Sequence, residues 1–458
     1  MPSSSSFSNT RRSGYHEGML IIGMQREEAQ ALYTEAGFAA GPANAETALP
    51  AAPGLTVLMQ LDQAGLIKQW NALARPSETE NVLPGPGAYV PAMLKAAVEQ
   101  SEDDPLSGLS MVQLDDDRVA SSLHEVLTRD QRVQFVARVP CRYFAQAPPP
   151  APRPAPVQWN LHKIRWDEVN QNAELDKAGQ IHVAVLDSGI DRDHPDLQGR
   201  VQSYTFAHPI LPGVSSELDL QGHGTHMAGI IAARSNNDVG INGICECRLR
   251  VWKIADDLLD GPDEDEYLVE PVMYRRALSD CLNDDDIKVI NLSISGDEPP
   301  DPVERDLIRG LLDQNKIIVA AMGNGGPLRG PAYPAAIDRV IAVGATKKND
   351  AVANFSRQGD HIALCAPGRR IWSTYPTYPG IREETDYDSG RGTSQAAAHV
   401  SAAVALLLAN KGEMTVEQVR NRLMDTADKV PRMGDNLWDP SYGAGRLNLL
   451  RLLTDPDD

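Results

Sequence analysis

The sequence predicts an α/β fold in which a mostly parallel sheet is sandwiched by helices and preceded by a smaller α/β region. After residue 156, continuous apolar strands alternate with amphipathic helices, which is typical of a parallel sheet covered on both faces. A tract rich in proline and alanine separates this part from the first 144 residues. The chain has 458 residues, 42% of them hydrophobic, so it is long enough to bury a large core.

The N-terminal region, residues 1–144, has the pattern of a small α/β unit. Short apolar runs bounded by polar residues predict strands, and two stretches have helical periodicity. The strands are expected at residues 19–24, 55–61 and 133–139, and the helices at residues 27–38 and 117–128.

Residues 145–156, with the sequence AQAPPPAPRPAP, form the clearest boundary in the chain. Proline has no backbone N–H to donate to a sheet ladder, so this tract predicts an extended linker of the polyproline type.

Residues 157–454 repeat a pattern of strand, loop and helix. Strands are expected at residues 181–187, 248–255, 288–295, 317–324 and 340–346, and helices at 223–233, 271–282, 303–315, 392–408, 414–430 and 442–453. In an open parallel sheet, functional groups gather at the carboxyl ends of the strands. Asp187, Ser293 and Asn324 each lie at such an end, so we expect them to share one cleft.

Composition and charge narrow the function classes. The formal net charge of −20 would repel phosphates, which disfavours binding to nucleic acid or to an anionic membrane surface. The N-terminus lacks an apolar run of signal-peptide length, and no stretch approaches the roughly 20 apolar residues that span a bilayer. The five cysteines form an odd set without paired metal spacing, in keeping with a reducing compartment. We therefore expect a cytoplasmic protein.

Three distant segments together predict nucleophilic serine chemistry. They are VAVLDSGID around Asp187, GHGTHMAG around His223, and GTSQAAAHV around Ser394. A serine hydroxyl is a poor nucleophile at neutral pH, so it needs a base within reach and a third group that orients the base. The order Asp, His, Ser along the chain is that of subtilisin.

On these motifs, residues 157–454 resemble a subtilisin-like serine peptidase of the subtilase family. The resemblance implies the subtilisin-like version of the predicted fold. It also implies that Asp187 orients His223, that His223 is the general base and acid, and that Ser394 forms the acyl-enzyme. Asn324, in AAMGNGG, matches the oxyanion-hole asparagine. Decayed relatives usually lose one of these residues, and a catalytically silent interaction protein is the alternative.

The resemblance also implies a substrate cleft. The segment INLSISG matches the family's substrate-binding strand, where Ser293, Ile294 and Ser295 would pair with an extended protein or peptide substrate as an added strand. Gly323 and Ala332 are expected at the pocket for the residue before the cut, which we expect to be small or medium and apolar.

A calcium site is the one cofactor that the resemblance suggests, in a structural role. The segments DRDHPDL and AARSNNDVGING resemble the family's tight calcium loop. Calcium prefers several oxygen donors of mixed origin. The expected ligands are the side chains of Asp196 and Asn237 and the carbonyls of Arg234, Val239 and Ile241. The alternative is an Asn/Gly turn without an ion.

The acidic insert at residues 256–267, DDLLDGPDEDEY, falls where relatives build the rim of the upstream substrate pockets. We expect Asp263, Glu264, Asp265 and Glu266 to favour Arg or Lys upstream of the cleaved bond, with Tyr267 walling the pocket. The alternative is a solvated charged surface.

The N-terminal region has two interpretations. Its tail, DQRVQFVARVPCRYFAQ, resembles the final strand of the inhibitory propeptides that precede many subtilase domains. On that basis it would act as an inhibitor or folding chaperone, and self-cleavage would fall near the linker. The other interpretation is a permanent regulatory or partner-binding domain.

Overall fold

The structure is a computed structural model whose chain divides into two compact units, Met1–Cys141 and Arg142–Asp458. It describes residues 15–24, 55–59, 109–114, 133–144, 158–170, 178–207, 216–237, 239–260, 267–380 and 385–456, and five helical positions between 121 and 128. The predicted linker at 145–156 and the acidic residues 263–266 lie outside the described residues.

The first unit contains a four-stranded antiparallel sheet with the order β2-β3-β1-β4. The strands are β1 (Tyr15–Met24), β2 (Leu55–Met59), β3 (Leu109–Leu114) and β4 (Val133–Pro140). Three of them are the apolar runs predicted at 19–24, 55–61 and 133–139. The predicted helix at 27–38 lies outside the described residues.

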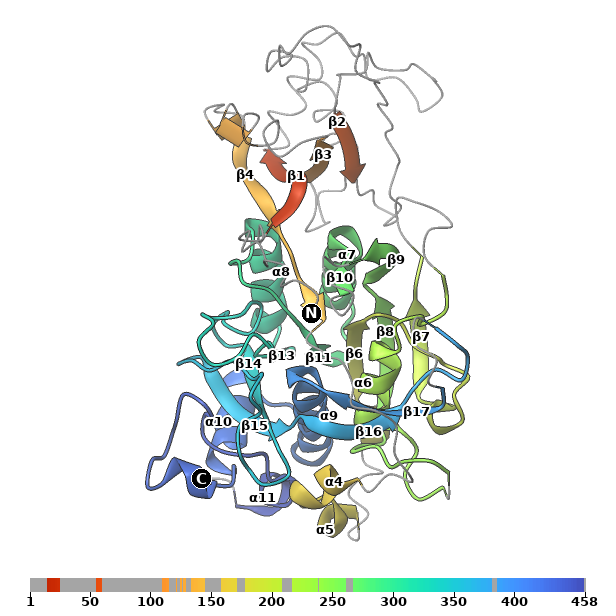
Figure 1. Ribbon diagram of the computed structural model, residues 1–458, viewed down its shortest axis with the longest axis vertical. Helices are drawn as coiled ribbons and strands as arrows, with labels where there is room; N and C mark the ends of the chain where they lie inside the picture. The colour runs from red at the N-terminus through yellow and green to blue at the C-terminus, as the bar shows by residue number, and fades with distance from the viewer. Residues whose placement is uncertain are drawn as a thin grey trace, which may run out of the picture. The chain divides into compact units, whose positions relative to one another are not determined.

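The second unit is built on a seven-stranded sheet with the order β15-β14-β13-β11-β6-β8-β7, in which every neighbouring pair is parallel (Figure 1). Its strands are β6 (His182–Asp187), β7 (Val201–Thr205), β8 (Arg248–Lys253), β11 (Ile287–Leu292), β13 (Ile317–Ala321), β14 (Ile341–Thr346) and β15 (Ile362–Pro367). The predicted parallel sheet is thus confirmed.

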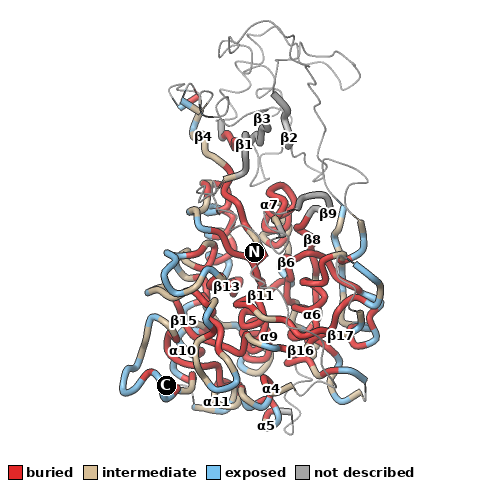
Figure 2. The backbone as a smooth tube through the Cα atoms, in the orientation of Figure 1, coloured by how far each residue is buried: buried red, intermediate tan, exposed pale blue. Residues whose placement is uncertain are grey.

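The helices lie on the sheet in two groups. Helices α6 (His223–Ala232) and α9 (Thr393–Lys411) contact each other and the central strands, while α7 (Pro271–Leu282) and α8 (Pro302–Asp313) form a second pair that also contacts the sheet (Figure 1). Small residues in α9 allow it to lie directly on the strands, and every residue from Thr393 to Leu408 is buried (Figure 2).

Further helices described by the structure complete the second unit. They are α4 (Trp159–Lys163), α5 (Trp166–Asn170), η3 (Pro195–Leu197), α10 (Val416–Asp425), η4 (Pro431–Met433) and α11 (Leu449–Thr454). The helix predicted at 442–453 begins only at Leu449, because Arg446 bridges to Cys365 and Asp428 instead of forming a helical turn. Within the described ranges, no helix is both long and apolar enough to cross a membrane.

A second, four-stranded sheet lies in the same unit, with the order β12-β5-β10-β9. Its strands are β5 (Tyr143–Phe144), β9 (Ala255–Asp260), β10 (Tyr267–Val269) and β12 (Ile294–Ser295). A separate antiparallel hairpin joins β16 (Arg369–Thr374) and β17 (Tyr387–Arg391), which leads into α9. Neither β9 nor this hairpin is among the elements predicted from the sequence.

Candidate active site

Asp187 and His223 form a buried pair at the carboxyl edge of the parallel sheet. Asp187 is the last residue of β6 and His223 is the first residue of α6. Their Oδ1 and Nδ1 atoms are 2.5 Å apart, and both side chains have 0% exposure. The backbone N–H of Ser188 donates to the same oxygen at 2.8 Å. Burial raises the pKa of Asp187 above its usual value, although His223 and the Ser188 N–H act in the opposite direction.

Asp219, which is not among the predicted site residues, holds the start of α6 in place. Its Oδ1 accepts from the hydroxyl of Ser188 at 2.8 Å and from the N–H of Gly222 at 2.9 Å. Its Oδ2 accepts from the N–H and the hydroxyl of Thr225, at 2.9 and 2.7 Å. By accepting from the N–H groups of Gly222 and Thr225, Asp219 fixes the start of α6, which carries His223. Its place four residues before His223 was the available signal.

Ser394 lies in the first turn of α9, two residues after the N-cap Gly392, and it is fully buried. Its hydroxyl donates to the carbonyl oxygen of Ser293 at 3.1 Å. Nε2 of His223 is buried and has no hydrogen-bond partner among the described residues. The histidine is therefore held by Asp187 on one side, while its other nitrogen is available to a proton donor.

Asn324 is oriented by the residue before Ser394. Its Oδ1 accepts from the N–H and the hydroxyl of Thr393, at 3.0 and 3.1 Å. The Thr393 hydroxyl in turn accepts from the N–H of Gly323 at 3.0 Å, and Gly323 has φ +88°, which favours glycine. These bonds leave Nδ2 of Asn324 buried and without a partner in the described part of the chain. Nδ2 and the free N–H of the first turn of α9 are donors of the kind that stabilise an oxyanion.

Part of the predicted substrate-binding segment is paired with the chain's own residues. Ile294 and Ser295, which form β12, pair antiparallel with Phe144 and Tyr143 of β5. On its other side, β5 pairs with Leu268 of β10. An extended segment from the end of the N-terminal region thus fills the position of an added strand.

Phe144 brings this segment to His223. The two ring centroids are 5.1 Å apart, with 49° between the ring planes, and both side chains are buried. Sequence reasoning did not name Phe144, because only the pairing of β5 with β12 places it there.

The remaining predicted substrate residues lie around the same strands. Gly323 follows β13, and Ala332 is fully buried beside the cis Tyr333–Pro334 bond, where Tyr333 bridges to Gly296. Tyr267 is the first residue of β10, but its side chain lies outside the described residues.

The predicted calcium loop is closed by hydrogen bonds. Asp196 is fully buried, and its Oδ1 accepts from Asn237 Nδ2 at 3.0 Å. Its Oδ2 accepts from the N–H of Ile241 at 2.9 Å and from the hydroxyl of Tyr387 at 3.1 Å. Oδ1 of Asn237 accepts from the N–H of Val239 at 3.2 Å. Hydrogen-bond donors thus point at the oxygens that calcium needs, so the side chains as they lie do not fit the ion.

Other clusters give no substitute site. Among the residues that the structure describes, no group of three or more His, Cys, Asp or Glu side chains is placed to hold a metal.

We predict that the stability of the fold depends on pH through His399, a buried residue of α9 five positions after Ser394. Its Nδ1 lies 2.7 Å from the carbonyl of Gln395, its Nε2 lies 3.0 Å from Asn160 Nδ2, and burial lowers the pKa of His399 from 6.5 to about 4. Between these values the unfolded chain binds a proton that the folded chain does not. We therefore expect the free energy of unfolding to fall by up to about 3 kcal/mol as the pH drops from 6.5 to 4.

Urea unfolding of the wild type and of His399→Gln at pH 7 and pH 4 isolates this effect from the protonation of carboxylates, which both chains share. The variant is expected to lose less stability on acidification than the wild type. Equal losses in the two chains would contradict the assignment to His399.

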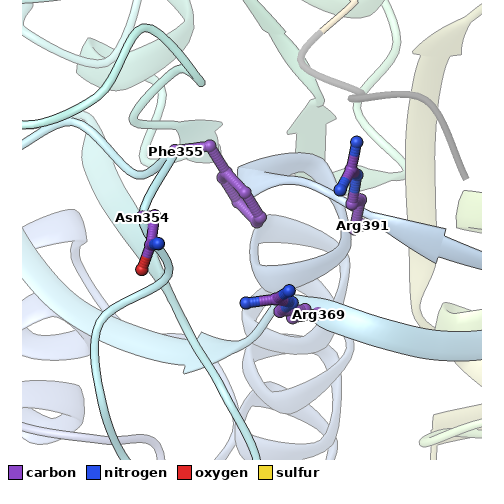
Figure 3. Close-up of a pocket in the computed structure, with 4 residues that line it drawn as sticks. All are labelled: Asn354, Phe355, Arg369 and Arg391. Carbon is purple, nitrogen blue, oxygen red and sulfur yellow. The ribbon is translucent and has the colours of Figure 1, made fainter. Parts of the chain in front are cut away.

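A separate cavity of about 350 Å³ lies beside the hairpin that leads into α9. Figure 3 shows its lining: Asn354, Phe355, Arg369 and Arg391. Arg369 and Arg391 face each other in register across β16 and β17. No predicted site residue is among the four residues of this lining.

The chain is similar to several known proteins. The model of the subtilase family matches residues 179–445. Subtilisin DY of Bacillus licheniformis is 32% identical over 296 residues, which cover 64% of this chain and 97% of that protein. Thermitase of Thermoactinomyces vulgaris is 33% identical over 267 residues, which cover 58% of this chain and 86% of that protein.

Fervidolysin of Fervidobacterium pennivorans, described as a keratinolytic enzyme related to subtilisin, is a solved structure with a similar fold. The TM-score is 0.66 at 21% identity, and the match covers 98% of this chain but 62% of the fervidolysin chain. The family match alone spans more than half of the 458 residues. The enzyme is therefore favoured over the silent interaction protein, and the chain belongs to the subtilase family of subtilisin-like serine endopeptidases.

Proposed function

We propose that the chain cleaves protein substrates through Ser394, His223 and Asp187. The observation that carries the proposal is the buried Asp187–His223 pair. Nε2 of His223 has no partner among the described residues, and Ser394, the candidate nucleophile, lies in the same unit. Nε2 takes the proton of the Ser394 hydroxyl as Oγ attacks the scissile carbonyl carbon. The imidazolium then gives that proton to the leaving amine, and an acyl-enzyme forms. A water molecule then attacks the acyl-enzyme while His223 takes its proton. His223 returns that proton to Ser394, and the carboxylic acid product leaves.

Asp187 and Asn324 would act on charge that appears only during the reaction. The carboxylate of Asp187 keeps the proton of His223 on Nδ1 and balances the positive charge of the imidazolium. Nδ2 of Asn324 and the N–H of Ser394 would donate to the oxyanion of the tetrahedral intermediate. The Ser394 hydroxyl must first leave the carbonyl of Ser293, which a rotation about one side-chain bond achieves.

The second part of the proposal is that the β5 segment, which ends the predicted N-terminal region, blocks the active site. The β5 segment lies between β12 and β10, where an extended substrate would pair, and Phe144 packs on His223. A bound substrate would have to displace these two strand pairings. The intact chain is therefore autoinhibited, and the N-terminal region is propeptide-like.

The register of β5 suggests where self-cleavage occurs. Phe144 is opposite Ile294 and Tyr143 is opposite Ser295, and Ser293 is the residue before Ile294 in that segment. The carbonyl of Ser293 accepts the hydroxyl of Ser394. The bond between residues 145 and 146 is thus the first candidate for the cut.

Mass spectrometry of the purified chain, with a fluorophosphonate probe in parallel, tests both parts. Labelling of Ser394 together with fragments that end at residue 145 and begin at residue 146 is expected. An intact chain that labels would contradict self-cleavage and keep the peptidase. Mild urea can be used to displace the β5 segment. If the probe still does not label Ser394, the catalytic assignment is contradicted.

We propose further that the Asp196 loop is stable without calcium, because Asn237, Ile241 and Tyr387 already occupy both carboxylate oxygens. We expect the same melting temperature in excess EGTA and in millimolar calcium. A bound ion at 1,000 times its dissociation constant would instead add about 4 kcal/mol.

Asp196→Asn serves as the control for the loop. It is expected to lower the melting temperature equally in both solutions, since an amide cannot accept all of these bonds. A calcium-dependent rise in the wild type that Asp196→Asn abolishes would restore the calcium site.

A further inference from the structure

Arg142, the residue just before β5, is bound in a buried pocket at the start of α8. Its Nε and Nη2 donate to the two carboxylate oxygens of Glu304 at 3.0 and 2.7 Å, and its Nη1 donates to the carbonyl of Glu298 at 3.1 Å. Arg142 is 2% exposed and Glu304 is 1% exposed. Burial would lower the pKa of Arg142, yet the charge of Glu304 outweighs it and holds the pKa above its usual value.

The carboxylate of Glu304 is positioned by the catalytic unit itself. The hydroxyl of Tyr274 donates to its Oε1 at 3.2 Å. Glu304 lies in the first turn of α8, where the helix dipole favours negative charge. The neighbouring N-cap, Asp301, is neutralised by Arg275 of α7. In the described part of the chain, the cation bound to Glu304 is Arg142, so removal of the β5 segment leaves a buried carboxylate without its ion-pair partner.

The bonds to Arg142 lie directly beside the strand pairings of β5. The carbonyl of Arg142 accepts from the N–H of Val269 at 2.9 Å, which continues the pairing of β5 with β10. Arg142 precedes Phe144 by two residues, and Phe144 packs on His223. The backbone pairing accepts any sequence, whereas the pocket around Glu304 makes three directed bonds to a guanidinium.

We propose that Glu304 makes this peptidase selective for arginine at the fourth residue before the cleaved bond, and that Arg142 holds the place of that arginine in the intact chain. The proposal rests on the proposed function, since it takes β5 to lie as a substrate lies. A substrate without a cation would leave Glu304 desolvated and unpaired, whereas lysine would satisfy the charge without the two-point fork. The carboxylate that carries this proposal belongs to α8. The acidic residues 263–266 of the insert lie outside the described residues.

The selectivity is tested with two peptides, Arg-Tyr-Phe-Ala and Gln-Tyr-Phe-Ala, each joined through its alanine to a fluorogenic amine. The enzyme is the full-length chain after incubation. The wild type is expected to prefer the arginine peptide at least about 30-fold in kcat/KM, the lower end for stranding one partner of a buried charge pair. In Glu304→Gln the ratio should fall to near one, mainly through slower cleavage of the arginine peptide. A ratio near one in the wild type, or an undiminished ratio in Glu304→Gln, would overturn the proposal.

Glu298→Gln is the matched control. It makes the same chemical change six residues away and keeps the backbone carbonyl that binds Arg142, so the wild-type preference should persist. A loss of preference in this variant as well would point to the general negative charge of the surface and overturn the role of Glu304. Melting temperatures of the variants verify that both are folded.

A binding measurement on an inactive variant tests the pocket around Glu304 independently of catalysis. In the full-length chain with Ser394→Ala and Arg142→Gln, the β5 segment lacks the ion pair with Glu304, and neither the chain nor the peptide is cleaved. Fluorescence anisotropy should show the arginine peptide bound at least about 30-fold more tightly than the glutamine peptide. Equal binding would overturn the pocket. Selective binding, with neither peptide cut by the wild type, would overturn the proposed function and leave the pocket standing.

Discussion

Replacement of Ser394 by alanine is expected to lower kcat for peptide cleavage by about 10⁶-fold, the loss known for the nucleophile of subtilisin itself. Ser394 is fully buried at the start of α9, and its side chain makes one hydrogen bond, to the carbonyl of Ser293. Losing that bond removes little packing, so the variant should fold as the wild type does. Cleavage rates of a fluorogenic peptide, divided by the protein concentration from absorbance, measure the effect.

The same variant should stay at full length on prolonged incubation, because self-cleavage uses the same serine. A Ser394→Ala chain that still produced the fragments seen in the wild type would assign processing to another protease. A variant with near wild-type turnover would place the nucleophile elsewhere. Circular dichroism of both chains controls for misfolding.

Replacement of Asn324 by alanine is expected to lower kcat by about 10²- to 10³-fold with little change in KM, a range taken from subtilisin. The amide donor Nδ2 has no partner in the resting structure, so what is lost is a bond that forms only as the oxyanion develops. Steady-state kinetics separate kcat from KM.

The variant also loses the acceptor for Thr393, whose N–H and hydroxyl both donate to Asn324. Asn324→Asp is therefore the matched control, since a carboxylate keeps that acceptor while removing the donor. The loss in Asn324→Asp should be at least as large as in the alanine variant. Recovery of activity in the aspartate variant would show that Asn324 acts by holding the loop and not by stabilising the oxyanion.

The parallel sheet and the principal site residues could be predicted because their signals are local. Apolar runs predicted β6, β11 and β13, and the carboxyl ends of parallel strands share one edge, which places Asp187, Ser293 and Asn324 at or just beyond that edge. The resemblance of short motifs added His223 and Ser394.

The rest depends on pairings between distant parts of the chain. Arg142 and Glu304 are 162 positions apart, and in sequence Glu304 is an ordinary acidic residue in the first turn of a helix. The end of the N-terminal region read as one strand, but Pro140 ends β4, and β5 pairs with β12 and β10 instead. Asp219 reads as a loop residue until Ser188 and Thr225 are found around it.

The position of β5 inside a four-stranded sheet has a consequence for control by dilution. Strands β12 and β10 each lose a neighbour when β5 departs, so two open edges are left facing one gap that any extended chain can fill. While it is tethered, β5 competes for that gap at an effective concentration of roughly millimolar. After a cut behind it, the same segment is a separate molecule and its occupancy falls with protein concentration. Under the proposed function, a concentrated solution of the cleaved protein would remain inhibited, and dilution alone would activate it.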